Sequence, residues 1–208
     1  MYKKYFKRFF DILISLIVII ILIPIFLIVF IAIKIEDRGP VIYKQIRTGK
    51  KGKNFNIYKF RSMTVETEKK GKKMTHDQRV TKVGRFLRKT SIDELPQVIN
   101  VLKGEMSIIG PRPWIPEYYQ NFNEKQKQRC NVLPGITGLA QARGRNGLTI
   151  FEKINYDIEY AENVSLKMDL RIIFESAIII FKREHAEIIQ EDIQTELEQL
   201  RTQKSKRK

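Results

Sequence analysis

Residues 12–33 read ILISLIVIIILIPIFLIVFIAI, a run of 22 residues without a charge. As an α-helix this run is about 33 Å long, enough to cross the hydrocarbon layer of a bilayer. It is longer than the apolar part of a secretory signal peptide, and no small-residue cleavage site follows it. The run therefore predicts a protein that is attached to a membrane by its N-terminal segment.

Basic residues flank the apolar run on both sides, and the positive-inside rule draws both flanks towards the cytoplasm. Pro24 lacks an N–H and its ring crowds the carbonyl of Ile20, so the helix is expected to bend near its middle. A re-entrant helix-break-helix hinged at Ile23 and Pro24 satisfies both observations. A kinked helix that spans the membrane is the alternative. The flanking basic residues are Lys3, Lys4, Lys7, Arg8, Lys34, Arg38, Lys44, Arg47, Lys50 and Lys51.

The chain has 208 residues and a net charge of +16, which calls for an anionic partner. That partner could be nucleic acid, an anionic phospholipid surface or a phosphorylated substrate. In a membrane-tethered protein, basic residues near an anionic leaflet each contribute about 1 kcal/mol, so we favour the phospholipid surface and expect no nucleic acid. The single cysteine, Cys130, excludes an internal disulfide and a multi-cysteine metal site.

The segment Ser91-Ile92-Asp93-Glu94-Leu95-Pro96 has the form of a capping box, with Glu94 three residues after Ser91. It predicts a short helix that ends at Lys103-Gly104. Asp93 and Glu94 would then lie at the positive end of the helix dipole, which favours their ionised forms. Two adjacent carboxylates repel each other, and Mg²⁺, which takes one or two protein carboxylates, would remove that repulsion. Taken alone, the segment would favour plain helix capping, and the surrounding residues change that interpretation.

Basic residues on both sides of the two carboxylates indicate a phosphorylated substrate. Arg85, Arg88 and Lys89 precede them, and Gly110-Pro111-Arg112-Pro113 follows. Guanidinium groups bind phosphate oxygens in a bidentate manner, and an arginine between two prolines has little backbone freedom left to lose. A structural ion pair on a loop is the alternative for Arg112.

The middle of the chain predicts a surface hairpin followed by irregular polar segments. Val41–Gln45 and Phe55–Phe60 read as two short strands. Glu66–Gln78 is polar and charged, and predicts a mobile loop. Ile115–Arg129 predicts a polar helix that begins with a proline. Residues 142–147 combine glycines, which let the backbone approach a ligand, with arginines, without matching a Walker A or GxGxxG pattern.

The C-terminal part predicts helices. Ile150–Asn163 is amphipathic, and Leu166–Phe181 is apolar but carries four charged residues, which argues against a second membrane span. A stripe at Ile189, Ile193, Leu197 and Leu200 predicts a solvent-exposed tail helix, which could pair with another subunit in a homo-oligomer.

These patterns predict a helix-rich α/β fold associated with a membrane. The expected parts are a re-entrant N-terminal membrane helix (1–35), a small cytosolic catalytic domain with amphipathic interfacial helices and a short β-hairpin (36–183), and a charged C-terminal tail (184–208).

Five motifs in order resemble the bacterial sugar transferase family, in particular its small monotopic phosphoglycosyl transferases. The resemblance covers about residues 7–183. The matching segments are KRFFD (7–11) before the apolar run, FNIYKFRSM (55–63), SIDELP (91–96), NVLKGEMSIIGPRP (100–113) and LPGITGLAQARGRN (133–146). The family often has Ser before the hinge proline, where this chain has Ile23.

The resemblance implies an enzyme at the cytoplasmic face of the bacterial inner membrane. It would transfer a sugar-1-phosphate from a UDP-sugar to polyprenyl (undecaprenyl) phosphate, giving polyprenyl-diphosphate-sugar and UMP, as the first membrane step of glycoconjugate assembly. Mg²⁺ would be the cofactor, with Glu94 as the family's metal ligand. Arg145 would contact the nucleotide, and Asp157 and Asp169 resemble acidic positions near the family's active site.

Two mechanisms use the same residues. In the first, the Asp93 carboxylate attacks the β-phosphorus and forms an aspartyl-phosphosugar, while Lys59, Arg88 and Arg112 bind phosphate oxygens next to Pro111. In the second, Asp93 is only a metal ligand in a ternary complex. The alternative to an enzyme is a basic membrane-anchored scaffold or a nucleic-acid-binding protein. The sequence leaves the sugar, the lipid length and the downstream pathway open.

Overall fold

A computed structural model describes residues 2–69, 71–144, 147–182 and 193–205. The α-helices are α1 (Lys7–Glu36), α2 (His76–Arg79), α3 (Lys82–Thr90), α4 (Gln97–Lys103), α5 (Pro116–Asn121), α6 (Glu124–Lys127), α7 (Leu139–Arg143), α8 (Ile150–Glu162), α9 (Leu166–Lys182) and α10 (Ile193–Ser205). A π-helical turn, η1 (Tyr2–Phe6), precedes α1, and 3₁₀ turns lie at η2 (Lys50–Gly52), η3 (Ile92–Glu94) and η4 (Gln128–Asn131). The strands are β1 (Ile42–Thr48), β2 (Asn54–Phe60), β3 (Glu68–Lys69), β4 (Lys72–Lys73), β5 (Ser107–Ile109) and β6 (Gly135–Thr137).

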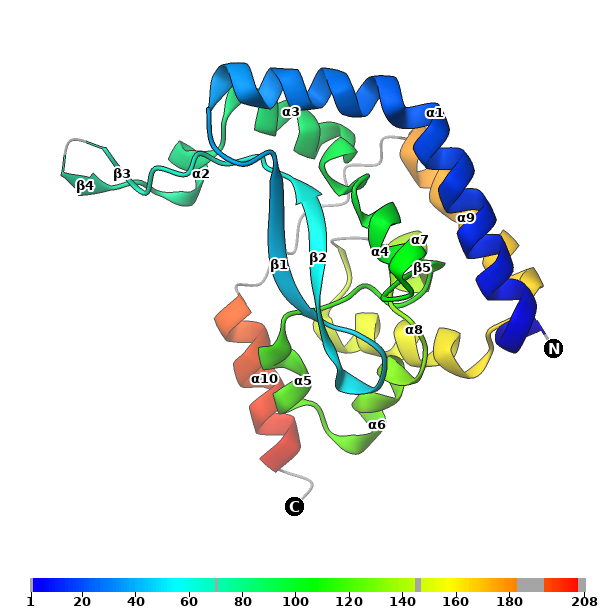
Figure 1. Ribbon diagram of the computed structural model, residues 1–208. Coiled ribbons are helices and arrows are strands. Elements are labelled where there is room, and N and C mark those ends of the chain that lie inside the picture. The colour runs from blue at the N-terminus through cyan, green and yellow to red at the C-terminus, as the bar shows by residue number, and fades with distance from the viewer. Residues whose placement is uncertain (1, 70, 145–146, 183–192, 206–208) are drawn as a thin grey trace.

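Helix α1 runs along one side of the molecule and leaves most of its apolar side chains exposed. It has 30 residues, about 45 Å of helix, and Figure 1 shows it changing direction along its length. In the described part of the chain it is the one helix long and apolar enough to cross a membrane. Pro24 lies inside it, and the helix continues through the proline, so the predicted helix-break-helix is one bent helix.

Both ends of α1 are fastened to the same globular domain. Near the N-terminal end, Arg8 donates hydrogen bonds to two carbonyls at the end of α4, and the Asp11 carboxylate accepts one from the backbone N–H of Ile108. At the C-terminal end, the Glu36 carboxylate accepts hydrogen bonds from the N–H groups of Lys82 and Val83, where α3 begins. These contacts cap or complete helix ends that would otherwise leave backbone groups unpaired.

The predicted hairpin is confirmed as the antiparallel pair β1 and β2. Its register places Lys59 opposite Tyr43 and Arg47 opposite Phe55. Because strand side chains alternate between two faces, Arg47 and Lys59 share one face, and Lys44 lies on the other. A second, parallel pair joins β5 to β6. Here a Cβ on Gly135 would lie 2.1 Å from the backbone nitrogen of Gly110, which explains a glycine at this close approach.

The predicted capping box at Ser91 is wrong. Ser91 adopts a left-handed conformation (φ 58°) at the C-terminal end of α3, and its side chain makes no capping hydrogen bond. Asp93 and Glu94 lie in the 3₁₀ turn η3, and α4 begins only after Pro96. The end of that helix is as predicted, since Gly104 has a φ of 82° and caps α4.

Two other local predictions differ from the structure. The expected loop at Glu66–Gln78 contains the β3–β4 ribbon and the start of α2, which Thr75 and Gln78 cap reciprocally. The single helix expected over Ile115–Arg129 is divided into α5, α6 and η4, because Phe122 is extended and Asn123 caps a new helix. Helices α8 and α9 lie where the sequence predicts them.

The tail helix α10 packs on the domain instead of lying in solvent. Leu197 and Leu200 are buried in a cluster with side chains of α5 and α8, including Tyr118, Phe122 and Ile154. Figure 1 shows α10 side by side with α5. The apolar stripe therefore has a partner inside the chain at these two residues. Ile189, which belongs to the same predicted stripe, lies outside the described residues.

Candidate functional site

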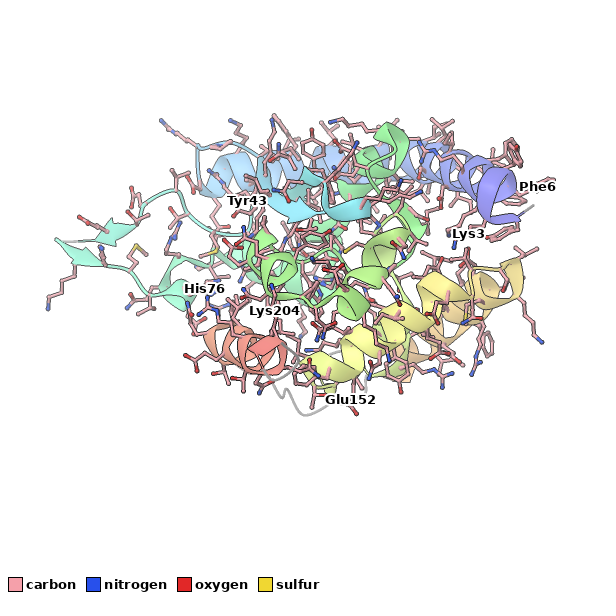
Figure 2. All side chains as sticks on the ribbon, turned by 90° about the horizontal axis from the view of Figure 1, so that it is seen from below. Lys3, Phe6, Tyr43, His76, Glu152 and Lys204 are labelled. Atoms are coloured by element: carbon pink, nitrogen blue, oxygen red, sulfur yellow. The ribbon has the colours of Figure 1, made fainter. Side chains whose placement is uncertain are left out.

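The turn η3 holds Asp93 and Glu94 between α3 and α4, facing the β1–β2 hairpin. Their side chains are 13% and 19% exposed, so both carboxylates are largely removed from water but remain reachable. Figure 2 shows the described side chains on the ribbon, with Tyr43 of the hairpin strand β1 labelled. The tight turn therefore places two neighbouring carboxylates together at a partly buried site.

The Glu94 carboxylate is fixed by two cations. Its Oε1 accepts hydrogen bonds from Lys59 Nζ at 2.7 Å and from an Arg112 guanidinium nitrogen at 2.9 Å. Burial alone would raise the pKa of Glu94, but the charges of Arg112 and Lys59 and their hydrogen bonds outweigh burial and lower that pKa to about 2. Glu94 is therefore ionised at neutral pH, and its carboxylate links Lys59 of β2 to Arg112 of the loop after β5.

Asp93 has the opposite electrostatic balance. Its Oδ2 lies 4.0 Å from Lys59 Nζ, beyond hydrogen-bonding distance. Burial raises the pKa of Asp93 above its ordinary value, the Lys59 charge offsets this in part, and the Glu94 charge raises it further. Burial therefore opposes the stabilisation of ionised Asp93 that its place at a helix end predicts. Its carboxylate is instead poorly stabilised by its surroundings, as suits a nucleophile.

Arg88, which precedes the two carboxylates in the sequence, acts on Asp93, and Arg112, which follows them, binds Glu94. Arg88 Nε donates a hydrogen bond to Ser62 Oγ at 2.8 Å, and its charge lowers the pKa of Asp93 in part. The side chain of Arg112 is 49% exposed between the buried rings of Pro111 and Pro113. The structure therefore brings together five residues predicted from sequence: Lys59, Arg88, Asp93, Glu94 and Arg112.

Asp157 is buried behind the Arg112 loop and does not contact the two carboxylates. It accepts hydrogen bonds from Arg129, which also donates to the backbone carbonyl of Arg112 at 2.7 Å and stacks 4.2 Å from the Trp114 ring centre. Burial raises the pKa of Asp157, and the Arg129 charge opposes this. The observed role of Asp157 is to hold Arg129 in place, and substrate contact by Asp157 stays a prediction.

Asp169 is also buried, next to the N-terminal end of α1. Its carboxylate accepts hydrogen bonds from the hydroxyls of Tyr2 and Tyr160 and from Lys7 Nζ, at 2.6 to 2.8 Å. Asp169 thus fastens the membrane helix to α9, and its predicted place near the substrate stays a prediction. Arg145 lies outside the described residues.

Arg47 was missed in the sequence analysis. It lies on the hairpin face of Lys59, and the next residue, Thr48, donates a backbone hydrogen bond to the Trp114 carbonyl at 2.8 Å. Burial and the charge of Arg112 lower the pKa of Arg47. The alternation of the predicted strand, extended two residues beyond Gln45, would have placed Arg47 on the same face of the hairpin as Lys59.

Asn100 was also missed, and it sets the position of Lys59. It is fully buried, its Oδ1 accepts a hydrogen bond from the Tyr58 N–H, and its Nδ2 donates to the Asn56 carbonyl and to Glu105. These bonds lock β2 to α4. Its sequence position in an apolar helix gave no signal of this, since the partners come from a distant strand.

The assembled site carries more positive than negative charge. Arg47, Lys59, Arg88 and Arg112 surround Asp93 and Glu94. Two guanidinium groups, those of Arg47 and Arg112, repel each other near one carboxylate. A ligand with several negative charges would relieve that repulsion, which points to a diphosphate. The described residues contain no group of three metal-ligating side chains, and at this site Asp93 and Glu94 are the carboxylates that could hold a cation.

Comparison with known proteins agrees with this chemistry. The family model described as bacterial sugar transferase matches residues 2–183. An uncharacterised sugar transferase of Bacillus subtilis, EpsL, is 47% identical over 141 residues, covering 68% of this chain and 70% of its own length. The galactosyl transferase CpsE of Streptococcus agalactiae is 45% identical, covering 66% of this chain and 34% of its own.

A third relative is the UDP-glucose:undecaprenyl-phosphate glucose-1-phosphate transferase of Klebsiella pneumoniae, 47% identical over 73% of this chain and 34% of its own length. The chain therefore spans most of EpsL but about a third of these two larger relatives.

The two neighbouring carboxylates should respond oppositely to neutral replacements of the same shape. Glu94→Gln removes a charge bound by two cations and should cost about 1–3 kcal/mol of folding free energy. Asp93→Asn removes a poorly stabilised buried charge and should leave the apparent Tm unchanged or raise it by about 2–4 °C per kcal/mol relieved. Thermal unfolding in detergent at pH 7 measures both.

The sign follows from the pKa values. The stability that Glu94 contributes is fully present above its ordinary pKa and is lost as the pH falls towards about 2. Asp93, with a raised pKa, has the reverse effect. A lower Tm for Asp93→Asn than for Glu94→Gln would contradict this account.

Proposed function

Because the chain belongs to the bacterial sugar transferase family, we propose that it transfers a sugar-1-phosphate from a UDP-sugar to polyprenyl phosphate such as undecaprenyl phosphate. The products are polyprenyl-diphosphate-sugar and UMP, and the reaction begins the assembly of a membrane-linked glycoconjugate. One observation carries the proposal: a carboxylate pair, one member fixed and one poorly stabilised, lies inside a ring of cations. A basic scaffold has no need of that arrangement.

Asp93 is the nucleophile in the proposed mechanism. A carboxylate oxygen of Asp93 attacks the β-phosphorus of the UDP-sugar, and the bond from that phosphorus to the bridging oxygen breaks, releasing UMP with the bonding electrons. The aspartyl-phosphosugar is then attacked by an oxygen of the polyprenyl phosphate, and the Asp93 carboxylate leaves. Two transfers at one phosphorus restore the enzyme.

The surrounding cations stabilise negative charge on the phosphates. Arg112 and Arg47 reach the site from the proline-flanked loop and the hairpin, and Arg88 approaches Asp93. Lys59 lies between the two carboxylates, 2.7 Å from Glu94 and 4.0 Å from Asp93. Because these cations are already in place, they stabilise the charge that develops in the transition state without first having to move. Such preorganisation is the usual source of electrostatic catalysis.

Mg²⁺ fits the donor set, because Asp93 and Glu94 offer hard carboxylate oxygens and this ion takes one or two protein carboxylates. Held by Glu94 and Asp93, it would neutralise diphosphate charge and polarise the phosphoryl group. The mechanism in which Asp93 is only a metal ligand uses the same residues, and the adduct experiment below separates the two.

We propose that α1 enters and leaves the cytoplasmic face of the bacterial inner membrane as a bent re-entrant helix. Arg8 and Asp11 fasten one end to the domain and Glu36 fastens the other, so both ends belong on the same side of the bilayer. A straight spanning helix would break one set of these bonds. On α9, Leu166, Leu170, Ile173 and Phe174 form an exposed apolar face that suits the interface.

The first prediction concerns activity and the covalent intermediate. Detergent-solubilised protein given undecaprenyl phosphate, Mg²⁺ and a panel of UDP-sugars should release UMP with one or a few donors. Quenched single turnover without acceptor should add the mass of one phosphosugar to the wild-type chain but not to Asp93→Asn. Turnover without any adduct would favour the ternary complex, and absence of turnover with every donor and lipid would favour the scaffold.

The second prediction concerns Arg47. Removing one charge-assisted contact with the donor diphosphate should raise the KM for the UDP-sugar about 10- to 100-fold in Arg47→Met. Lys44→Met is the matched control, because Lys44 lies three residues away on the opposite face of β1, and its KM should stay within about twofold of wild type. Equal effects in the two variants would show that net charge alone matters.

The third prediction concerns topology. A cysteine placed at Lys3 or at Arg38 should be protected from an impermeant thiol reagent in intact cells and labelled after permeabilisation. The native Cys130 is buried and gives little background. Labelling of either position from outside would show that α1 spans the membrane.

A further inference from the structure

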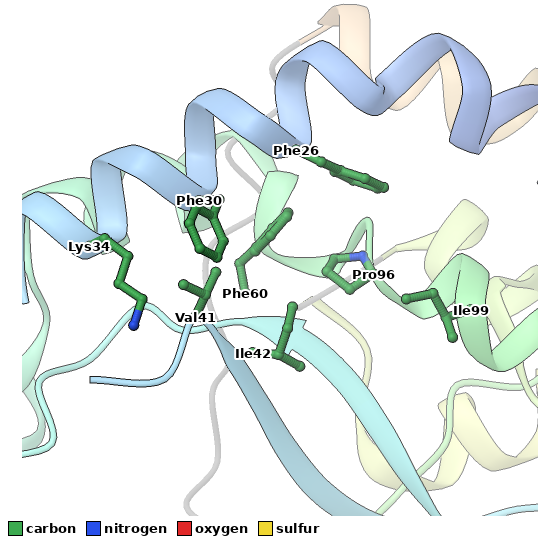
Figure 3. Close-up of a pocket in the computed structure, with 8 residues that line it drawn as sticks. All are labelled: Phe26, Phe30, Lys34, Val41, Ile42, Phe60, Pro96 and Ile99. Atoms are coloured by element: carbon green, nitrogen blue, oxygen red, sulfur yellow. The ribbon is translucent and has the colours of Figure 1, made fainter. Parts of the chain in front are cut away.

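An apolar groove of about 450 Å³ lies beneath the C-terminal half of α1. Figure 3 shows side chains from three places converging on it: Phe26 and Phe30 from α1, Phe60 from β2, and Pro96 and Ile99 at the start of α4. Its volume falls within the range of small-molecule sites. Nothing in the proposed transfer of a polar donor uses this groove.

The walls of the groove are almost entirely hydrocarbon. The remaining lining residues are Val41, Ile42 and Lys34. The Phe26 and Phe60 rings, which both line the groove, meet edge to face with centroids 5.5 Å apart. Such walls provide no partners for the hydroxyls of a sugar or the carbonyls of uracil, and burying those groups unpaired would be costly. The groove therefore selects an apolar ligand.

The groove is continuous with the membrane side of the protein. It is roofed by α1, whose exposed apolar residues on this half include Ile23, Leu27, Ile28 and Ile31. Lys34, the one charged side chain in the lining, lies at the edge of the groove in Figure 3. An apolar chain could therefore pass from the hydrocarbon layer into the groove without crossing water, with a cation at the margin.

The groove also lies near the turn that carries the two carboxylates. Pro96 comes three residues after Asp93, so their Cα atoms are at most about 11 Å apart. Ile92, the residue before Asp93, packs against the apolar cluster that contains Phe60, as Phe26 does.

We propose that this groove binds the first isoprene units of the polyprenyl phosphate acceptor and delivers its phosphate to Asp93. The inference rests on the proposed function and adds to it a binding site for the lipid chain. An ordinary phospholipid acyl chain has the same hydrocarbon chemistry. The acceptor is favoured because its phosphate must meet the aspartyl-phosphosugar, and Pro96, which lines the groove, follows the turn that carries Asp93.

Filling the groove tests the proposal. Ile99 is 41% exposed, so Ile99→Trp can place an indole in the groove without disturbing the core. The KM for undecaprenyl phosphate should rise about tenfold or more, whereas the KM for the UDP-sugar should stay within about twofold. The preference for undecaprenyl phosphate over a ten-carbon prenyl phosphate should fall, because the shorter chain makes fewer contacts with the groove and so loses less binding when the groove is filled. Ile31→Trp, on the outer side of α1, is the control and should behave as wild type.

Single-turnover UMP release without acceptor separates the groove from the proposed function. It should be unchanged in Ile99→Trp, because the first step does not use the lipid. If wild type releases no UMP in either assay, the proposed function fails. If wild type is active and Ile99→Trp keeps its acceptor KM and chain preference, the groove proposal is wrong.

Direct labelling distinguishes the two lipid sources and covers the case of a misfolded variant. A prenyl phosphate with a diazirine on its second isoprene unit should crosslink wild-type protein at peptides containing Phe26, Phe60 or Ile99. Undecaprenyl phosphate should compete with this labelling and phosphatidylglycerol should not. Equal competition by phosphatidylglycerol would assign the groove to ordinary phospholipid and overturn the proposal.

Discussion

The hydrogen bonds that Lys59 and Arg112 donate to one oxygen of Glu94 hold the reactive part of the structure together. They join the second strand, the η3 turn and the loop after β5, which are far apart in the sequence. Lys59 and Glu94 are largely shielded by neighbouring chain, so the bond between them is little screened by salt, whereas Arg112 is about half exposed. If Glu94 were neutral, two cations would be left facing each other, and the geometry around Asp93 would lose its support.

Buried polar groups extend this support outwards. Asn100 holds the strand that carries Lys59, and the Asp157–Arg129 pair holds the backbone carbonyl of Arg112. Both are hydrogen-bonded groups in the interior, which are costly to disturb, although Oδ1 of Asp157 has no hydrogen-bond partner among the described residues. The side chains that would touch substrate are thus oriented by others that do not, and Asp93 alone among the acidic residues at the site is left without a hydrogen-bonding cation.

Features that depend on local chemistry were predictable from the sequence, and features that depend on distant partners were not. The apolar period of α8, the hairpin and the glycine that ends α4 are local, and all three were identified. Ser91 matched the pattern of a residue that begins a helix, but it ends the preceding helix α3. The two helices are so close in sequence that the same residue could serve either end. The docking of Leu200 and the burial of Asp157 depend on segments tens of residues away.

The bent helix and the site constrain each other. A helix of about 45 Å that is bonded to one domain at Arg8 and again at Glu36 cannot be withdrawn at either end without breaking these hydrogen bonds. In the proposed topology the domain is held against the face from which α1 enters the bilayer, and the apolar groove stays under the second half of α1. In that arrangement a soluble nucleotide donor would reach the proposed site from water, and a lipid acceptor would reach it from the membrane.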